Sequence, residues 1–239
     1  WRFLRARTEL QRLREPQSEP GFAWHAVNVE GEVKFAQQSR HGNGIVRVNE
    51  HGPWRCLMFD DVEQGLAYTD RDGSVDPDVL GYEYLRTMVA SGLGFCGLPS
   101  ASCGPPTSEP QRMVFVGLGT GALPAFVAHK LPSVRVDVVE IDPVVVRAAR
   151  CQLGCRFTLG ASKPVEAGEY RVHIDDAKAY VGGLARRRAL RGALSGVRSR
   201  IIDGDVAKAD SSPEPGTALS AIFLDAYDGK GAIPDHLMR

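Results

Sequence analysis

The chain has 239 residues with 29 basic and 29 acidic side chains, so its formal net charge is zero. This length suits one large domain, or one domain with a small companion, and can bury a core without a disulfide or metal. Apolar residues make up 43% and charged residues 24%, as in ordinary globular proteins. Zero net charge argues against nucleic-acid binding through bulk electrostatics, and no apolar run approaches the roughly 18 residues of a membrane span. The five cysteines include no Cys-x-x-Cys pair, so no zinc site is indicated.

The N-terminal third is predicted to hold an extension and a small β-module. Residues 1–20 mix arginines and glutamates with few apolar residues, and we expect a poorly ordered extension there. Residues 21–75 are the β-module, in which three short runs are rich in β-formers: 44–50, 54–59 and 66–69. A helix is expected from about Pro77, because Asp76 is a good N-cap and proline suits the first helical position.

Strands and helices then alternate, which predicts an α/β fold. The expected elements are strands over 113–116, 134–139, 171–174 and 221–224, with helices over 122–131 and 143–151. This rhythm indicates a Rossmann-like parallel sheet with helices on its faces, so residues 76–239 are expected to form a nucleoside-binding domain. An arginine-rich insertion at 182–217 interrupts it. We favour a solvated insertion over an RNA-binding patch, because no aromatic residue interleaves the arginines for base stacking.

Three glycines after the first apolar strand predict a nucleotide site. Gly117, Gly119 and Gly121 allow a tight turn and a close approach of a ligand to the backbone. Glu140 lies at the end of the second strand, where a carboxylate can accept hydrogen bonds from ribose hydroxyls. The glycines fit both the dinucleotide and the S-adenosylmethionine patterns. Asp176, after the third strand, favours the S-adenosylmethionine pattern, since it is placed to meet an adenine amino group. It can also cap the helix that follows.

Two further carboxylates follow the fourth strand. Asp225 and Asp228 lie at the carboxyl end of this strand, where ligands of α/β proteins bind. Paired acids at that place suit a cationic amine substrate. The alternative is a solvated turn with an Asx cap.

With these motifs in order, the chain resembles the spermidine synthase-like family, which shares the class I S-adenosylmethionine-dependent methyltransferase fold. The resemblance covers most of residues 44–239 outside the insertion. It rests on seven segments: residues 60–64, 82–84, 117–121, 139–142, 176–177, 225–228 and 233–237.

The resemblance implies a role for each residue of the donor site. The three glycines would cradle S-adenosylmethionine or its decarboxylated form, and Glu140 would bind the ribose. Asp176, with the backbone of Ala177, would bind the adenine. Gln64 of the β-module would close over the donor. No metal is implied.

For the acceptor, the resemblance implies that Asp225 and Tyr82 handle the attacking amine and that Asp228 holds the far amine of a diamine. The chain also departs from the family pattern. Spermidine synthases carry an acid at the positions of Thr120 and Tyr84. Both departures weaken the case for putrescine as the acceptor.

The expected function is therefore transfer of an aminopropyl-type group from decarboxylated S-adenosylmethionine to a small-molecule amine, as in polyamine biosynthesis. An S-adenosylmethionine-dependent methyltransferase, an inactive donor-binding or interaction module and an NAD-dependent oxidoreductase stay open as alternatives. The expected partners exclude membranes and nucleic acid, a homodimer is left open, and the expected location is intracellular, in the cytoplasm or an organelle.

The last expectation concerns the C-terminus. The family's sheet has seven strands, of which the sequence predicts four in the nucleotide-binding domain before the chain stops at Arg239. The fourth strand would then be an exposed edge. We expect a C-terminally truncated domain that is marginally stable and inactive alone.

Overall fold

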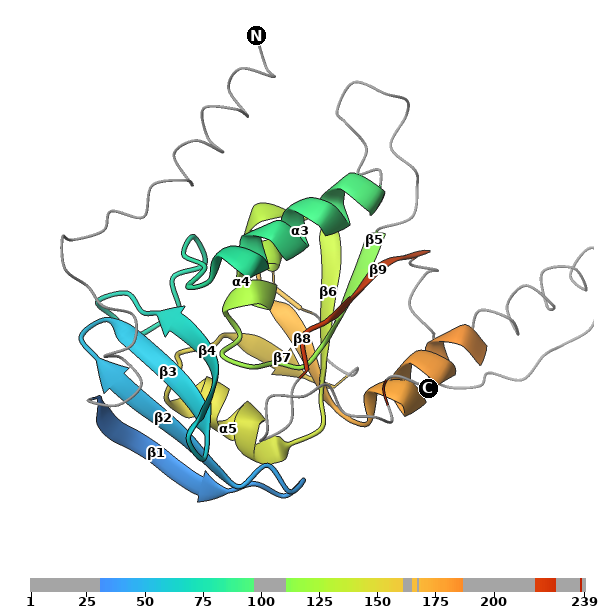
Figure 1. The fold of residues 1–239 in the computed structure, drawn as a ribbon. Helices are drawn as coiled ribbons and strands as arrows, with labels where there is room; N and C mark the ends of the chain where they lie inside the picture. Colours follow the sequence, from blue (N-terminus) through green and yellow to red (C-terminus); the bar gives the residue numbers. More distant parts are fainter. Residues whose placement is uncertain are drawn as a thin grey trace, which may run out of the picture.

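The structure is a computed structural model that describes residues 31–96, 111–160, 165–166, 168–186, 218–226 and 237. All structural statements below concern these residues. They form an antiparallel four-stranded sheet and a parallel five-stranded sheet, with helices packed on the parallel sheet (Figure 1). This confirms the expected α/β class and the small β-module that precedes it. The expected domain boundaries remain a prediction.

The antiparallel sheet has the order β1-β2-β3-β4, with strands Glu32–Gln38, Ile45–His51, Trp54–Phe59 and Val62–Tyr68. β2 and β3 match the predicted runs. β4 begins earlier than the predicted run at 66–69, because Val62 and Glu63 pair with the end of β3. β1 was not predicted. It is an edge strand with a largely exposed burial pattern, so its sequence lacks a clear apolar alternation.

The helix expected from Pro77 begins later. α3 spans Glu83–Cys96. The Asp76 side chain accepts a hydrogen bond from the backbone N–H of Asp78 at 2.8 Å, and its carbonyl oxygen accepts one from Val79 at 3.3 Å. These bonds close a single turn. Asp76 therefore caps an isolated turn, and the helix itself begins only at Glu83.

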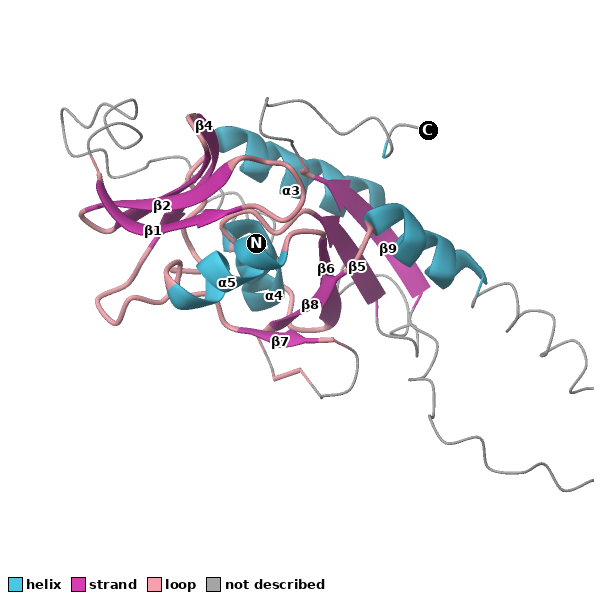
Figure 2. Ribbon diagram, turned by 90° about the horizontal axis from the view of Figure 1, so that it is seen from below, coloured by secondary structure: helices cyan, strands magenta, loops and turns pink. Residues whose placement is uncertain are grey.

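The parallel sheet has the order β7-β8-β6-β5-β9. Its strands are β5 (Gln111–Val116), β6 (Val134–Glu140), β7 (Phe157–Leu159), β8 (Tyr170–Ile174) and β9 (Ala218–Leu224). β7 was not predicted, because three residues give no readable pattern. Helices α4 (Ala122–Lys130) and α5 (Pro143–Cys151) cover one face, and a helix over 177–186 lies on the other face (Figure 2). The expected Rossmann-like arrangement is thereby confirmed.

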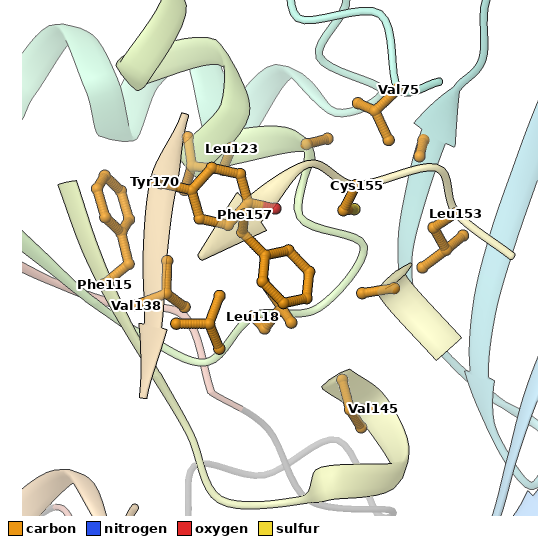
Figure 3. Packing of buried hydrophobic residues seen from close by; sticks show 14 of the residues in the cluster. Val75, Phe115, Leu118, Leu123, Val138, Val145, Leu153, Cys155, Phe157 and Tyr170 are labelled. Carbon is orange, nitrogen blue, oxygen red and sulfur yellow. The ribbon is translucent and has the colours of Figure 1, made fainter. Parts of the chain in front are cut away.

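One apolar core joins the two sheets. The rings of Phe115 and Phe223 stack with their centroids 4.6 Å apart on the face of the parallel sheet that α4 covers. Tyr170 and Phe157 extend the same cluster (Figure 3). Val46, Val48 and Leu57 of the antiparallel sheet are fully buried members of this cluster. The β-module therefore packs directly on the domain that follows, and this packing brings β4 to the glycine turn.

Candidate functional site

The glycine turn between β5 and α4 is built on left-handed backbone. Gly117, Gly119 and Gly121 have φ values of 93°, 53° and 73°. A Cβ at Gly117 would lie 2.4 Å from the carbonyl oxygen of Asp225, and one at Gly121 would lie 2.5 Å from the Sγ of Cys155. The nearest atom to a Cβ at Gly119 would be 4.0 Å away. The outer two glycines are thus required by internal packing, whereas a Cβ at the middle one would meet the carbonyl oxygen of Gln64 at an ordinary van der Waals distance, so Gly119 is required by its left-handed φ alone.

The Glu140 carboxylate ties the turn to the end of β6. Its Oε2 accepts a hydrogen bond from the backbone N–H of Leu118 at 2.9 Å, and its Oε1 accepts one from Asp142 at 2.8 Å. Burial raises the pKa of Glu140, and these backbone donors oppose the rise. A carboxylate has about four acceptor sites, so Glu140 can also accept from a ribose hydroxyl. Its position agrees with the ribose role, which stays a prediction.

Asp176 caps the helix over 177–186. Its Oδ1 accepts the backbone N–H of Ala179 at 2.8 Å, and its carbonyl oxygen accepts that of Tyr180 at 2.9 Å. Ala177 is 9% exposed and packs with Val114 and its neighbours on this face of the sheet. The capping alternative is confirmed, and binding of adenine by Asp176 and Ala177 remains a prediction.

Strand β4 lies against the glycine turn. A Cβ at Gly65 would be 3.1 Å from the Cγ2 of Thr120, whose hydroxyl donates to the carbonyl oxygen of Leu66 at 3.3 Å. The carbonyl oxygen of Gln64 is the atom nearest to a Cβ at Gly119. The structure therefore places the backbone of Gln64 beside the turn, and its donor-closing role stays a prediction. Thr120 is only 6% exposed, because it serves as the contact between the two sheets.

Asp225, directly after β9, lies on the other side of the turn. Its backbone N–H donates to the carbonyl oxygen of Val116 at 3.0 Å. The Oη of Tyr84 lies 3.4 Å from the Oδ1 of Asp225, and the rings of Tyr82 and Tyr84 stack at 5.7 Å with an interplanar angle of 26°. Burial raises the pKa of Asp225, and the Tyr84 hydroxyl opposes the rise. An acid and two aromatic rings thus come together beside Gly117.

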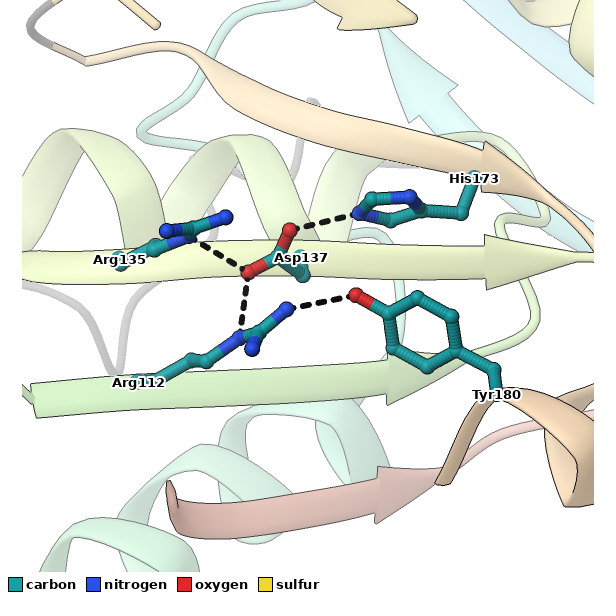
Figure 4. Close-up of polar contacts among 5 residues, drawn as sticks. All are labelled: Arg112, Arg135, Asp137, His173 and Tyr180. Atoms are coloured by element: carbon teal, nitrogen blue, oxygen red, sulfur yellow. Dashed lines mark hydrogen bonds and ion pairs between the residues drawn. The ribbon is translucent and has the colours of Figure 1, made fainter. Parts of the chain in front are cut away.

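A second polar cluster, around Asp137, was not predicted from the sequence. Asp137, with 0% exposure, accepts hydrogen bonds on Oδ2 from the Nε of Arg112 at 2.7 Å and the Nε of Arg135 at 3.0 Å (Figure 4). Its Oδ1 lies 2.7 Å from the Nε2 of His173, and a nitrogen of Arg112 donates to the Tyr180 hydroxyl at 2.6 Å. Burial alone would raise the pKa of Asp137, but the His173 hydrogen bond and the two arginines lower it to about 2.

This cluster anchors the helix over 177–186 to β5, β6 and β8. The signal that could have revealed it is the presence of charged side chains on one face of otherwise apolar strands. Buried charges need partners, so alternate polar positions on neighbouring strands predict a shared network.

Some expectations lie outside the described residues. They include Asp228, residues 1–20 and most of the arginine-rich insertion. Within the described ranges, no three His, Cys, Asp or Glu side chains are grouped as metal ligands would be. None of the helices that the structure describes is both long and apolar enough to span a bilayer.

Comparison with known proteins confirms the resemblance to polyamine enzymes and adds methyltransferases. The chain is 28% identical over 191 residues to the polyamine aminopropyltransferase of Vibrio vulnificus. It is 36% identical over 104 residues to the eEF1A lysine and N-terminal methyltransferase of Danio rerio. These matches cover 80% and 44% of this chain but only 47% and 14% of the relatives. The chain thus spans about half the length of the first relative and a small part of the second.

No family model matches the chain. Among solved structures, a probable spermidine synthase from Corynebacterium glutamicum is similar, with a TM-score of 0.43 and 17% identity over 63% of this chain and 46% of the other. The spermidine synthase from Thermotoga maritima has a TM-score of 0.38 and 19% identity, over 62% of this chain and 42% of the other.

Proposed function

We propose that the chain binds an S-adenosyl donor at the glycine turn and transfers an aminopropyl-type group from it to an amine held at Asp225. The observation that carries this proposal is the contact between Gly117 and Asp225. The Asp225 carbonyl oxygen comes so close to Gly117 that no side chain fits between them. A donor on the turn and an amine at Asp225 would therefore be neighbours, which is the arrangement that group transfer needs.

The residues of the turn fit an adenosyl group. Gly119 has no side chain to keep a ligand from the backbone of the turn, and the buried carboxylate of Glu140 retains acceptor capacity for ribose hydroxyls. Asp176 and Ala177 follow the neighbouring strand β8, at the same edge of the sheet. The backbone of Gln64 brings strand β4 of the β-module next to Gly119.

The donor supplies an alkyl carbon that its sulfonium already activates, so the chain's own residues position the amine. The attacking amine must be neutral. A carboxylate with an ordinary pKa of about 3.9 is a weak base toward an ammonium with a pKa near 10. Burial raises the pKa of Asp225 and narrows this gap. In the proposed mechanism Asp225 orients the amine and accepts its proton as the new C–N bond forms and the C–S bond breaks.

A methyltransferase is the second candidate, and Thr120 favours it. This neutral side chain is buried against β4, so it offers no negative charge to an aminopropyl ammonium on the turn. Intact S-adenosylmethionine carries a carboxylate as well as an ammonium at that end. Because the carboxylate balances the charge of the ammonium, this donor depends less on an acidic side chain at the position of Thr120. The methyltransferase relatives add support for this reading.

The products distinguish the two candidates. The chain is incubated with an amine and either decarboxylated or intact S-adenosylmethionine, and the nucleoside product is identified by mass spectrometry. Aminopropyl transfer releases methylthioadenosine, and methyl transfer releases S-adenosylhomocysteine. We expect methylthioadenosine from the decarboxylated donor. Release of S-adenosylhomocysteine alone would establish the second candidate. No amine-dependent product from either donor would refute both for this chain and would agree with the expectation of a truncated domain that is inactive alone.

A further inference from the structure

The loop between β1 and β2 links the β-module to the donor site on a side away from β4. Ser39, directly after β1, lies against the start of α5, and α5 packs beside both strands (Figure 1). We propose that Ser39 is a positioning residue of the donor site, which acts through Asp142 to hold the Glu140 carboxylate in place for the ribose hydroxyls. This role rests on the proposed function, because it concerns the same carboxylate.

The hydroxyl of Ser39 is fully used by hydrogen bonds. It donates to the Oδ2 of Asp142 at 2.5 Å, and its oxygen accepts the backbone N–H groups of His41 at 3.0 Å and Asn43 at 3.2 Å. The backbone N–H of Ser39 donates to the carbonyl oxygen of Gly44 at 2.8 Å, which closes the loop. A hydroxyl has one donor and two acceptor sites, so the loop itself fixes the direction in which Ser39 donates.

Asp142 passes this constraint to Glu140. Asp142 has no exposed surface and Ser39 is 8% exposed, so their contact is shielded from water. The Oδ1 of Asp142 accepts the backbone N–H of Val144 at 2.9 Å and so caps α5. The backbone N–H of Asp142 donates to the Oε1 of Glu140, whose Oε2 accepts from Leu118. A continuous chain of hydrogen bonds therefore runs from the β1–β2 loop to the glycine turn.

Loss of the Ser39 hydroxyl would disturb this chain without removing a group that touches the donor. One carboxylate oxygen of Asp142 would lose its partner in a buried place, and the segment that presents its N–H to Glu140 would be less tightly held. A ligand-binding group keeps its geometry only when its supporting hydrogen bonds are in place. The effect should therefore appear only with ligands that carry ribose hydroxyls for Glu140.

The experiment compares methylthioadenosine with its 2′,3′-dideoxy analogue by calorimetry on the 239-residue chain. Ser39→Ala should weaken the binding of methylthioadenosine by about three- to tenfold and leave that of the analogue within about twofold, because the analogue has no hydroxyls for Glu140. Thr69→Val is the matched control. Thr69 is 5% exposed and donates its hydroxyl to the carbonyl oxygen of Pro53 at 2.9 Å, in the turn between β2 and β3. This variant should also lower Tm by a few degrees but leave both affinities within about twofold.

Hydrogen exchange gives a readout that needs no ligand. In the unliganded chain, protection of the Asp142 amide should fall by about tenfold or more in Ser39→Ala and stay within about twofold in Thr69→Val. This comparison also decides the case if the analogue binds too weakly for calorimetry. Thermal melting of each variant confirms that it is folded.

The outcomes separate this role from the proposed function. Equal weakening of both ligands in Ser39→Ala, or an unchanged affinity for methylthioadenosine, overturns the positioning role and leaves the donor site standing. Unchanged protection of the Asp142 amide overturns it as well, and so does equal binding of the two ligands by the unsubstituted chain. Failure of methylthioadenosine to bind to the unsubstituted chain removes the donor site and the role together.

Discussion

Replacement of Gly119 by alanine tests the donor site without disturbing the core. The residue has a φ of 53°, and its new Cβ would have no neighbour closer than 4.0 Å. The cost to stability is then that of a left-handed alanine, about 1–2 kcal/mol, with no added cost from overpacking. For a chain of this size, that corresponds to a fall in Tm of roughly 2–8 °C.

Gly73 offers the matched control. It has a φ of 79°, and a Cβ there would meet nothing within 4 Å, but it lies outside the candidate site. Gly73→Ala and Gly119→Ala should lower Tm by similar amounts. Only Gly119→Ala should weaken methylthioadenosine binding, by about tenfold or more, because its methyl group would lie on the turn that the proposed ligand approaches. Equal dissociation constants for the two variants in calorimetry would refute the placement of the donor on this turn.

Three further substitutions probe the rest of the account. Gly117→Ala should lower the free energy of unfolding by about 2–5 kcal/mol in chemical denaturation, because the strain of a left-handed alanine adds to a clash with the backbone of Asp225. A decrease in the free energy of unfolding equal to that of Gly73→Ala would contradict this. Asp137→Asn should cost about 3–5 kcal/mol, since it leaves buried cations without their anion. With Asp137 intact, roughly 2 kcal/mol of stability should be present above pH 3.8 and lost as the pH falls to about 2, and a pH titration of Asp137→Asn should lack that step. Asp225→Asn should slow turnover by about 100-fold or more while methylthioadenosine binding stays within threefold, and full activity would exclude Asp225 from amine transfer.

The periodic parts of the fold could be predicted from the sequence. The parallel strands are short apolar runs that alternate with helical segments, and α5 matches its predicted bounds because Asp142 and Pro143 mark its start clearly. The glycine turn with Glu140 downstream predicted the ligand-facing edge of the sheet. The structure places Gln64, Glu140 and Asp225 around that turn, and their roles in binding stay predictions.

The remaining features depend on tertiary contacts that one sequence does not reveal. Asp76 has the character of a helix cap, yet it closes an isolated turn. The Tyr84 substitution was visible in the sequence, but its stacking on Tyr82 and its approach to Asp225 required the packing of α3 beside β9. The Asp137 cluster joins three strands and a helix, so its members are far apart in the sequence.

The most direct test of the central claim is calorimetric titration of the 239-residue chain with three ligands: S-adenosylmethionine, its decarboxylated form and NAD. If the glycine turn and Glu140 hold an adenosyl sulfonium donor, at least one of the first two ligands binds at one site per chain and NAD does not. Binding of NAD in preference to both sulfonium ligands, or binding of none of the three by the folded chain, would contradict the account.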